Sequence, residues 1–219
     1  MNKKENLYID KESTYFSNIR YDIINLIPQG CSNVLEIGCA DGSTLVELKK
    51  IGKAKYVCGI DIVDLNQFKK LDKFILADIE RDEIDLPRNY FDVIICTDVL
   101  EHLVDPWNTL KKLKNFLKED GIVVASIPNI REIKTMLNIF VKGDFKYVNT
   151  GILDKTHLRF FCKKNIIELF DQTGFEIIKI SNNLNIKSKR FILNLITFGI
   201  FEEFLVVQYL IVAKSKNGI

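Results

Sequence analysis

The chain has 219 residues, 47% hydrophobic and 27% charged, which predicts a globular protein with a single domain over residues 1–219. The net charge is only +2 and the lysines are spread along the chain, so a nucleic-acid partner is not expected. No apolar run is long enough to cross a bilayer. Five cysteines form no CxxC pair, and we expect reduced thiols in a cytoplasmic protein.

Short apolar runs alternate with amphipathic segments along most of the chain. Residues 1–30 predict an N-terminal helical cap, with a helix from Ser13 to Ile27. Strands are expected at Val34–Ile37, Tyr56–Ile60, Phe74–Ala77, Phe91–Thr97, Ile122–Ile127, Phe175–Ser181 and Phe204–Ala213. Helices are expected at Ser43–Ile51, Asp64–Lys70, Pro106–Lys118 and Lys163–Gln172. This alternation predicts an α/β fold with right-handed crossovers and a mostly parallel sheet.

Residues 129–161 interrupt the alternation. They contain a helix candidate followed by an irregular stretch that is longer than a normal connection. Loops of that length inside a compact domain are usually functional. We therefore expect residues 129–161 to form a lid that takes part in binding the substrate.

Carboxylates stand at the predicted ends of four successive strands. They are Glu36 with Asp41 after the first strand, Asp61 after the second, Asp78 after the third and Asp98 after the fourth. In open α/β sheets, ligands bind beyond these strand ends. An acidic rim repels a pyrophosphate, but it suits a ligand with an ammonium, a sulfonium and hydroxyl groups. S-adenosylmethionine is such a ligand.

The turn after the first strand supports this choice. Residues 34–45 read VLEIGCADGSTL, in which Gly38, Ala40 and Ser43 occupy the positions of a GxGxxG dinucleotide fingerprint. Two of its three glycines are therefore missing. Gly38, which remains, and Gly42 in the same turn allow the backbone to approach a ligand closely.

On these motifs the chain resembles the class I S-adenosylmethionine-dependent methyltransferases, from about Cys31 to Ser181. EIGCADG is similar to their first motif, E/D-x-G-x-G-x-G, from which Ala40 departs. The resemblance implies a Rossmann-like, doubly wound sheet of seven strands with an antiparallel last strand. It implies that Asp61 binds the ribose hydroxyls and Asp78 the adenine amino group, with Ile79 beside the ring. The implied cofactor-binding residues are Glu36, Gly38, Cys39, Ala40, Asp41, Gly42, Asp61, Ile62, Asp78, Ile79, Thr97 and Asp98.

The chain has only two histidines, and both stand in segments of interest. Methyl transfer is an in-line displacement, and a hydroxyl acceptor benefits from a general base. His157, in LDKTHLRFF of the lid, is our candidate for that base or for a residue that orients the acceptor, with Arg159 or Asp154 in support. His102, in DVLEHLVDP, is a candidate for catalysis or for ordering the pocket wall. No residue spacing indicates a metal site.

The GxLDxTHLRFF pattern resembles one in bacterial methyltransferases associated with glycan and cell-surface polysaccharide assembly. This resemblance predicts O-methylation of a sugar, a glycan or a related small molecule. Two alternatives stay open. One is an N-methyltransferase that acts on an amino group, and the other is a cofactor-binding subunit without catalysis. The oligomeric state is open as well.

Near the end of the chain, basic residues at 187–190 precede an apolar run at 191–201. Two interpretations apply to residues 187–201: a membrane-surface helix, or a buried helix packed before the last strand. Asn194, Thr197 and Gly199 interrupt the apolar run, which favours the buried helix.

Overall fold

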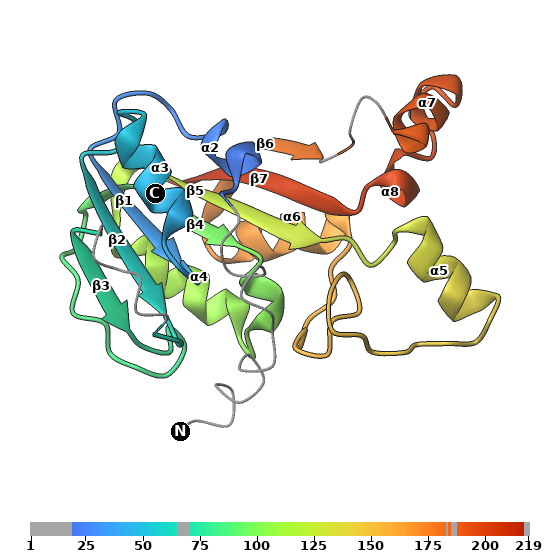
Figure 1. Cartoon of the computed structure of the whole chain (residues 1–219), viewed down its shortest axis with the longest axis horizontal. Coiled ribbons are helices and arrows are strands. Elements are labelled where there is room, and N and C mark those ends of the chain that lie inside the picture. Colours follow the sequence, from blue (N-terminus) through green and yellow to red (C-terminus); the bar gives the residue numbers. More distant parts are fainter. Residues whose placement is uncertain (1–18, 65–70, 183, 185–187, 217–219) are drawn as a thin grey trace.

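The computed structural model describes residues 19–64, 71–182, 184 and 188–216. A seven-stranded sheet forms the centre, in the order β3-β2-β1-β4-β5-β7-β6 (Figure 1). The strands are β1 (Asn33–Ile37), β2 (Tyr56–Asp61), β3 (Lys73–Leu76), β4 (Phe91–Thr97), β5 (Leu117–Pro128), β6 (Phe175–Asn182) and β7 (Gln208–Ser215). β7 is antiparallel to both of its neighbours, and the pairings among β1 to β5 are parallel. The predicted Rossmann-like sheet with an antiparallel last strand is confirmed.

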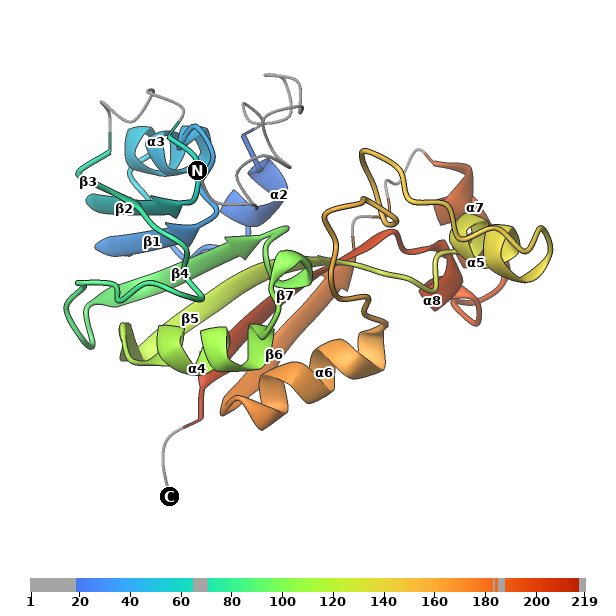
Figure 2. The same cartoon turned by 90° about the horizontal axis from the view of Figure 1, so that it is seen from below.

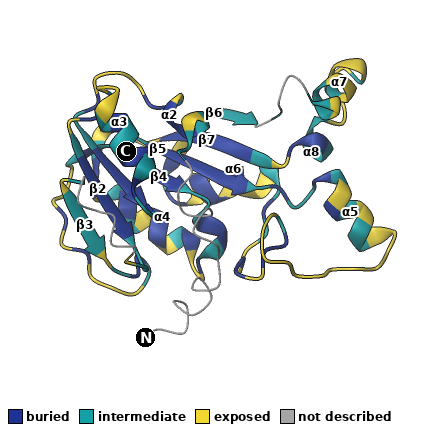
Figure 3. Ribbon diagram, in the orientation of Figure 1, coloured by how far each residue is buried: buried dark blue, intermediate teal, exposed yellow. Residues whose placement is uncertain are grey.

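Helices cover both faces of the sheet (Figure 2). The helices of the described residues are α2 (Tyr21–Ile24), α3 (Ser43–Lys50), α4 (Pro106–Lys114), α5 (Ile133–Phe140), α6 (Lys163–Gln172), α7 (Lys189–Ile196) and α8 (Glu202–Leu205), with the 3-10 helix η3 (Leu100–His102). Of these, α2 and α3 lie on one face of the sheet and α4 and α6 on the other (Figure 2). Because successive strand residues point to opposite faces, Val34 and Leu35 belong to two separate apolar clusters. One cluster includes residues of α2 and α3, and the other includes residues of α4 and α6. Figure 3 shows the resulting buried layers.

Some predicted boundaries are wrong because strand pairing overrides local sequence signals. The helix expected to reach Lys118 ends at Lys114, since β5 begins at Leu117 and pairs there with Phe91. The last strand begins at Gln208, because residues 202–205 form α8. The helix expected at Asp64–Lys70 lies mostly outside the described residues. The first part of the helix expected at Ser13–Ile27, before residue 19, also lies outside the described residues. Within the rest of that range, the structure has a helix at Tyr21–Ile24.

The lid at residues 129–161 folds back onto the rest of the domain. Its ends meet in a bridge between Asn129 and Phe161, where the amide of Ile130 donates to the carbonyl of Phe161 at 2.9 Å. The amides of Leu158 and Arg159 donate to the carbonyl of Glu101 at 2.8 and 3.0 Å. The last part of the lid therefore lies directly against η3.

The apolar run at residues 191–201 is not the buried helix that the sequence favoured. α7 has no buried residue, and Phe198 just after it is 93% exposed. The physical reason is the topology: β6 and β7 are adjacent and antiparallel, so their connection does not have to cross a sheet face. α7 lies instead at the end of the molecule that also carries α5 (Figures 1 and 2). Within the described part of the chain, no helix combines the length and hydropathy that a membrane span requires.

Candidate active site

A cavity of about 490 Å³ lies at the carboxyl ends of the parallel strands. Eleven of the twelve predicted cofactor-binding residues line it: Glu36, Gly38, Cys39, Ala40, Asp41, Asp61, Ile62, Asp78, Ile79, Thr97 and Asp98. The exception is Gly42, which precedes α3 with a positive φ of 73°. These residues lie together because the carboxyl ends of parallel strands are on the same side of the sheet, where ligands bind in open α/β folds.

The turn between β1 and α3 contains backbone in the left-handed region, which glycine adopts without strain. Gly38 has a φ of +67°, and a Cβ built there would lie 2.6 Å from Cγ2 of Val99. Ala40 also has a positive φ, 48°. Its amide donates to Oδ2 of Asp61 at 2.8 Å, so the end of β2 holds the turn in place.

Asp41 and Asp61 both stabilise backbone near the cavity. Asp41 accepts from the amide and the hydroxyl of Ser43 at 3.0 and 2.7 Å, which holds the first turn of α3. The Oδ1 of Asp61 accepts from the amide of Val63 at 3.0 Å. Both carboxylates also line the cavity, so neither structural contact removes them from reach of a ligand.

Glu36 is the most perturbed carboxyl of the cofactor half. It is 4% exposed, and among the described residues its Oε2 has no hydrogen-bond donor. Burial, together with the negative charge of Asp61, raises the pKa of Glu36 to about 8. A buried carboxyl without a partner on one oxygen fits a cationic ligand group such as an ammonium.

Arg20 is a cavity residue that the sequence analysis missed. Its Nη1 donates to Oδ2 of Asp98 at 2.5 Å, and its Nη2 donates to Oε1 of Gln208 at 3.1 Å. Gln208 also donates to Oδ1 of Asp98, which accepts from the hydroxyl of Ser126 as well. The charge of Asp98 is therefore compensated within the protein. No sequence signal could have found Arg20, because only the fold brings it to the end of β4.

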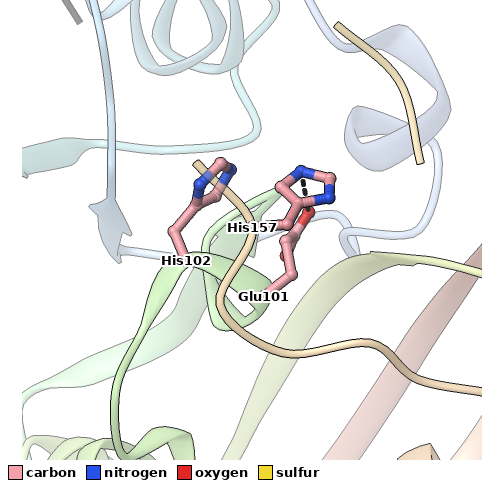
Figure 4. A group of neighbouring side chains, drawn as sticks. All are labelled: Glu101, His102 and His157. Atoms are coloured by element: carbon pink, nitrogen blue, oxygen red, sulfur yellow. Dashed lines mark ion pairs between the residues drawn. The ribbon is translucent and has the colours of Figure 1, made fainter. Parts of the chain in front are cut away.

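The other half of the cavity is lined by Glu101, His102, Asp154 and His157 (Figure 4 shows three of them). Glu101 and His157 point toward one another, with 4.0 Å between Oε1 and Nε2. The two imidazole rings are 4.6 Å apart at their centroids, with an interplanar angle of 78°. The lid thus brings both histidines of the chain to one wall of the cavity.

Glu101 was not singled out in the sequence, although it stands next to His102. Its side chain is 1% exposed, and neither carboxylate oxygen accepts a hydrogen bond from any described residue. Burial and the charge of Asp98 raise the pKa of Glu101 well above its usual range. The only local signal was the LEH triplet itself, which does not reveal burial.

The two residues proposed to support His157 differ in position. Asp154 lines the cavity and accepts from the amide and hydroxyl of Thr156 at 2.9 and 2.7 Å. Arg159 does not line it: its Nε donates to the carbonyl of Val104 at 3.1 Å, and its guanidinium lies over the ring of Trp107. Arg159 is therefore placed to fasten the lid rather than to contact a ligand.

Comparison with known proteins identifies the family. The family described as "Methyltransferase domain" matches residues 10–180, more than half of the chain. The chain belongs to this family, whose cofactor is S-adenosylmethionine. The cavity fits that cofactor, because the buried Glu36 faces a space that is also lined by Asp61 and Asp78.

Two curated relatives have sequences similar to this chain. A ubiquinone biosynthesis O-methyltransferase of Neisseria meningitidis is 27% identical over 155 residues, which cover 66% of this chain and 63% of the relative. A tRNA U34 carboxymethyltransferase of Campylobacter jejuni is 34% identical over 148 residues, which cover 62% of this chain and 50% of the relative. The chain therefore spans less than two thirds of either relative.

Solved structures of low sequence identity share the fold. A methyltransferase from Archaeoglobus fulgidus has a TM-score of 0.62 at 20% identity and covers 92% of this chain and 96% of its own. The 1,6-didemethyltoxoflavin N1-methyltransferase of Burkholderia thailandensis, with bound S-adenosylhomocysteine, has a TM-score of 0.65 at 10% identity. It covers 97% of this chain and 85% of its own.

Proposed function

We propose that this protein transfers the methyl group of S-adenosylmethionine to a hydroxyl oxygen of a sugar, a glycan or a related small molecule. The observation that carries the proposal is the composition of the cavity wall. Cofactor-motif residues line one half, and the lid places His157 and Asp154 in the other half. Methyl donor and acceptor can therefore meet in one cavity, as an in-line displacement requires.

In this reaction the cofactor supplies an activated methyl group on its sulfonium. The protein binds its ammonium group beside Glu36 and its ribose beside Asp61. In the acceptor half, His157 orients the hydroxyl or accepts its proton at Nε2. A carbonyl oxygen can only accept, so the contact of 2.9 Å between Nδ1 and the carbonyl of Ile152 places a proton on Nδ1. Nε2 of the neutral ring then carries the lone pair.

The choice of oxygen as the methylated atom rests on the imidazole of His157. A hydroxyl acceptor benefits from a general base, whereas an amine acceptor needs only to be unprotonated. The name of the O-methyltransferase relative agrees with oxygen but concerns a ubiquinone precursor, which widens the acceptors to be tested to phenols. The name of the tRNA relative raises a nucleic-acid acceptor. Arg20 is the only Lys or Arg among the described lining residues, so the cavity offers little to a phosphate backbone.

The proposal is tested by measuring S-adenosylhomocysteine formation over nucleotide sugars, glycans, phenols and amino compounds. We expect His157→Ala to reduce kcat by about 100-fold or more, as for loss of a catalytic acid or base, with nearly unchanged affinity for S-adenosylmethionine. Leu158→Ala, a change at the neighbouring half-exposed position of the lid, is the control and retains turnover. Turnover only with amines, or full turnover of His157→Ala, would contradict the proposal.

A further inference from the structure

The two histidines of the chain and one buried glutamate form a cluster at the wall of the cavity. One ligand atom each from Glu101, His102 and His157 lies within 4.8 Å of the others. Glu101 and His102 belong to η3 and His157 belongs to the lid, so tertiary folding brings His157 to the other two (Figure 4). Two imidazole nitrogens and a carboxylate oxygen form a donor set that binds divalent transition metals.

Glu101 provides the second, independent observation. Its carboxylate is 1% exposed and lines the cavity, and neither oxygen accepts a hydrogen bond from the part of the chain that the structure describes. The imidazole of His157, 4.0 Å from Oε1, compensates the buried carboxylate only when the ring is protonated, and a buried carboxylate that is not compensated costs several kcal/mol. A bound cation offsets that cost because an oxygen of the carboxylate then coordinates a positive charge.

The hydrogen bonds of the histidines suit ligation. The Nδ1 atoms lie 3.1 Å from the carbonyl of Thr156 for His102 and 2.9 Å from the carbonyl of Ile152 for His157. Metal-binding histidines are usually oriented by such a bond from the second ring nitrogen to a carbonyl or carboxylate. The contacts present Nε2 with its lone pair, which is the form that binds a metal.

We propose that Glu101, His102 and His157 bind a divalent transition-metal ion whose remaining coordination positions face the cavity. Nitrogen ligands favour ions such as Mn²⁺, Fe²⁺, Co²⁺ or Zn²⁺ over Mg²⁺, which prefers oxygen. Metal–ligand bonds of about 2.0–2.2 Å require these atoms to approach to roughly 3.0–3.5 Å of one another. The 4.0 Å between Glu101 and His157 therefore shortens when the ion binds.

The consequence for catalysis rests on the proposed function. An acceptor hydroxyl that occupies an open position on the ion becomes more acidic, so its proton passes to water and its oxygen becomes the nucleophile. The C–S bond to the methyl group breaks as the O–C bond forms, and S-adenosylhomocysteine leaves. His157 then orients the acceptor through the ion and does not take its proton.

The test uses full-length protein without a histidine tag, treated with a chelator and titrated with Co²⁺ alone. We expect one equivalent to bind, seen in calorimetry and in visible absorption of the ion. Glu101→Gln and His157→Asn should each weaken binding by about 10–100-fold or more. Glu36→Gln is the matched control, a buried glutamate in the other half of the cavity, and should bind Co²⁺ normally. Thermal unfolding midpoints establish that each variant is folded.

Absence of Co²⁺ binding, or binding that Glu101→Gln leaves intact, overturns the proposed metal site. If chelated protein also turns over while His157→Ala does not, His157 acts without a metal and the proposed function stands. If Co²⁺ binding depends on Glu101 and His157 but no hydroxyl acceptor is methylated, the metal site stands and the proposed function fails. The two proposals therefore fail separately.

Discussion

At the residue scale, Glu36 combines burial with an unpartnered oxygen and a pKa of about 8. At pH 7 the free protein therefore holds a proton there. If the cationic part of S-adenosylmethionine binds beside Glu36, it favours the carboxylate and releases that proton. We expect calorimetric binding enthalpies at pH 7 to vary with the ionisation enthalpy of the buffer and to indicate release of up to one proton. Glu36→Gln should remove this dependence, and a buffer-independent wild type would contradict the assignment.

The same pKa has a consequence for stability. Because the folded-state pKa lies above the ordinary value of 4.5, the folded protein binds the proton more tightly than the unfolded chain. The contribution is complete below pH 4.5 and is lost as the pH rises to about 8. We expect the free energy of unfolding of the wild type to decline over this interval relative to Glu36→Gln. Urea unfolding at a series of pH values measures the difference, and parallel curves would refute it.

Asp61 is predicted to bind the ribose and also accepts from the amides of Ala40 and Val63. Loss of hydrogen bonds to a charged group costs about 1.5–3 kcal/mol, so Asp61→Ala should weaken S-adenosylmethionine binding by roughly 10–100-fold. Calorimetry measures the affinity. Asp105→Ala, which removes the N-cap of α4, is the control that lowers stability without changing affinity. Equal affinity of Asp61→Ala and wild type would show that Asp61 serves the turn only.

At the element scale, the turn between β1 and α3 carries strain at a position where the family motif has glycine. Ala40 has a positive φ of 48°, which costs a residue with a Cβ about 1–2 kcal/mol. We expect Ala40→Gly to raise the free energy of unfolding by up to about 1 kcal/mol, since the gain is partly offset by the entropy of the unfolded chain. Gly38→Ala should have the opposite effect, because its Cβ would lie 2.6 Å from Val99. Urea midpoints of both variants give the comparison.

α7 and the residues after it are the element whose burial the sequence predicted wrongly. Phe198 and Ile200 are 93% and 76% exposed, so they contribute little to packing. We expect the double change Phe198→Ser with Ile200→Ser to shift the thermal midpoint by no more than about 1–2 °C, as for surface positions. A larger fall would mean that another molecule covers these side chains. The membrane-surface interpretation of residues 187–201 stays a prediction, which vesicle flotation of this double variant and wild type would test.

At the scale of the whole molecule, the cavity joins the sheet edge to the lid, so ligand binding stabilises both. At 100 times its Kd, S-adenosylhomocysteine should add about 2.7 kcal/mol to the free energy of unfolding. For a chain of this length the thermal midpoint should then rise by roughly 5–10 °C. Differential scanning calorimetry measures the shift. A shift that Asp61→Ala leaves undiminished would place the ligand outside the proposed cavity.

The sequence by itself determined the fold class and where the cofactor half of the cavity would form. Short apolar runs and glycine turns are local properties, and a parallel sheet brings strand-end residues such as Glu36, Asp61 and Asp98 together at the carboxyl ends of its strands. That these residues line the cavity could therefore be predicted from the strand ends alone, without knowledge of side-chain packing. Element boundaries followed less well, because the pairing of Leu117 with Phe91 decides where β5 begins.

Only the tertiary structure decided the chemistry of the acceptor half. Arg20 reaches Asp98 from before the first strand, and Gln208 reaches it from the start of the last. The lid brings His157 to Glu101 and His102, which lie on a different element. Burial, charge compensation and ligand geometry depend on contacts between distant parts of the chain. Periodicity and short motifs carry information only about neighbours in sequence. The LEH triplet therefore does not reveal that Glu101 is buried close to both His102 and His157, because His157 comes from the lid.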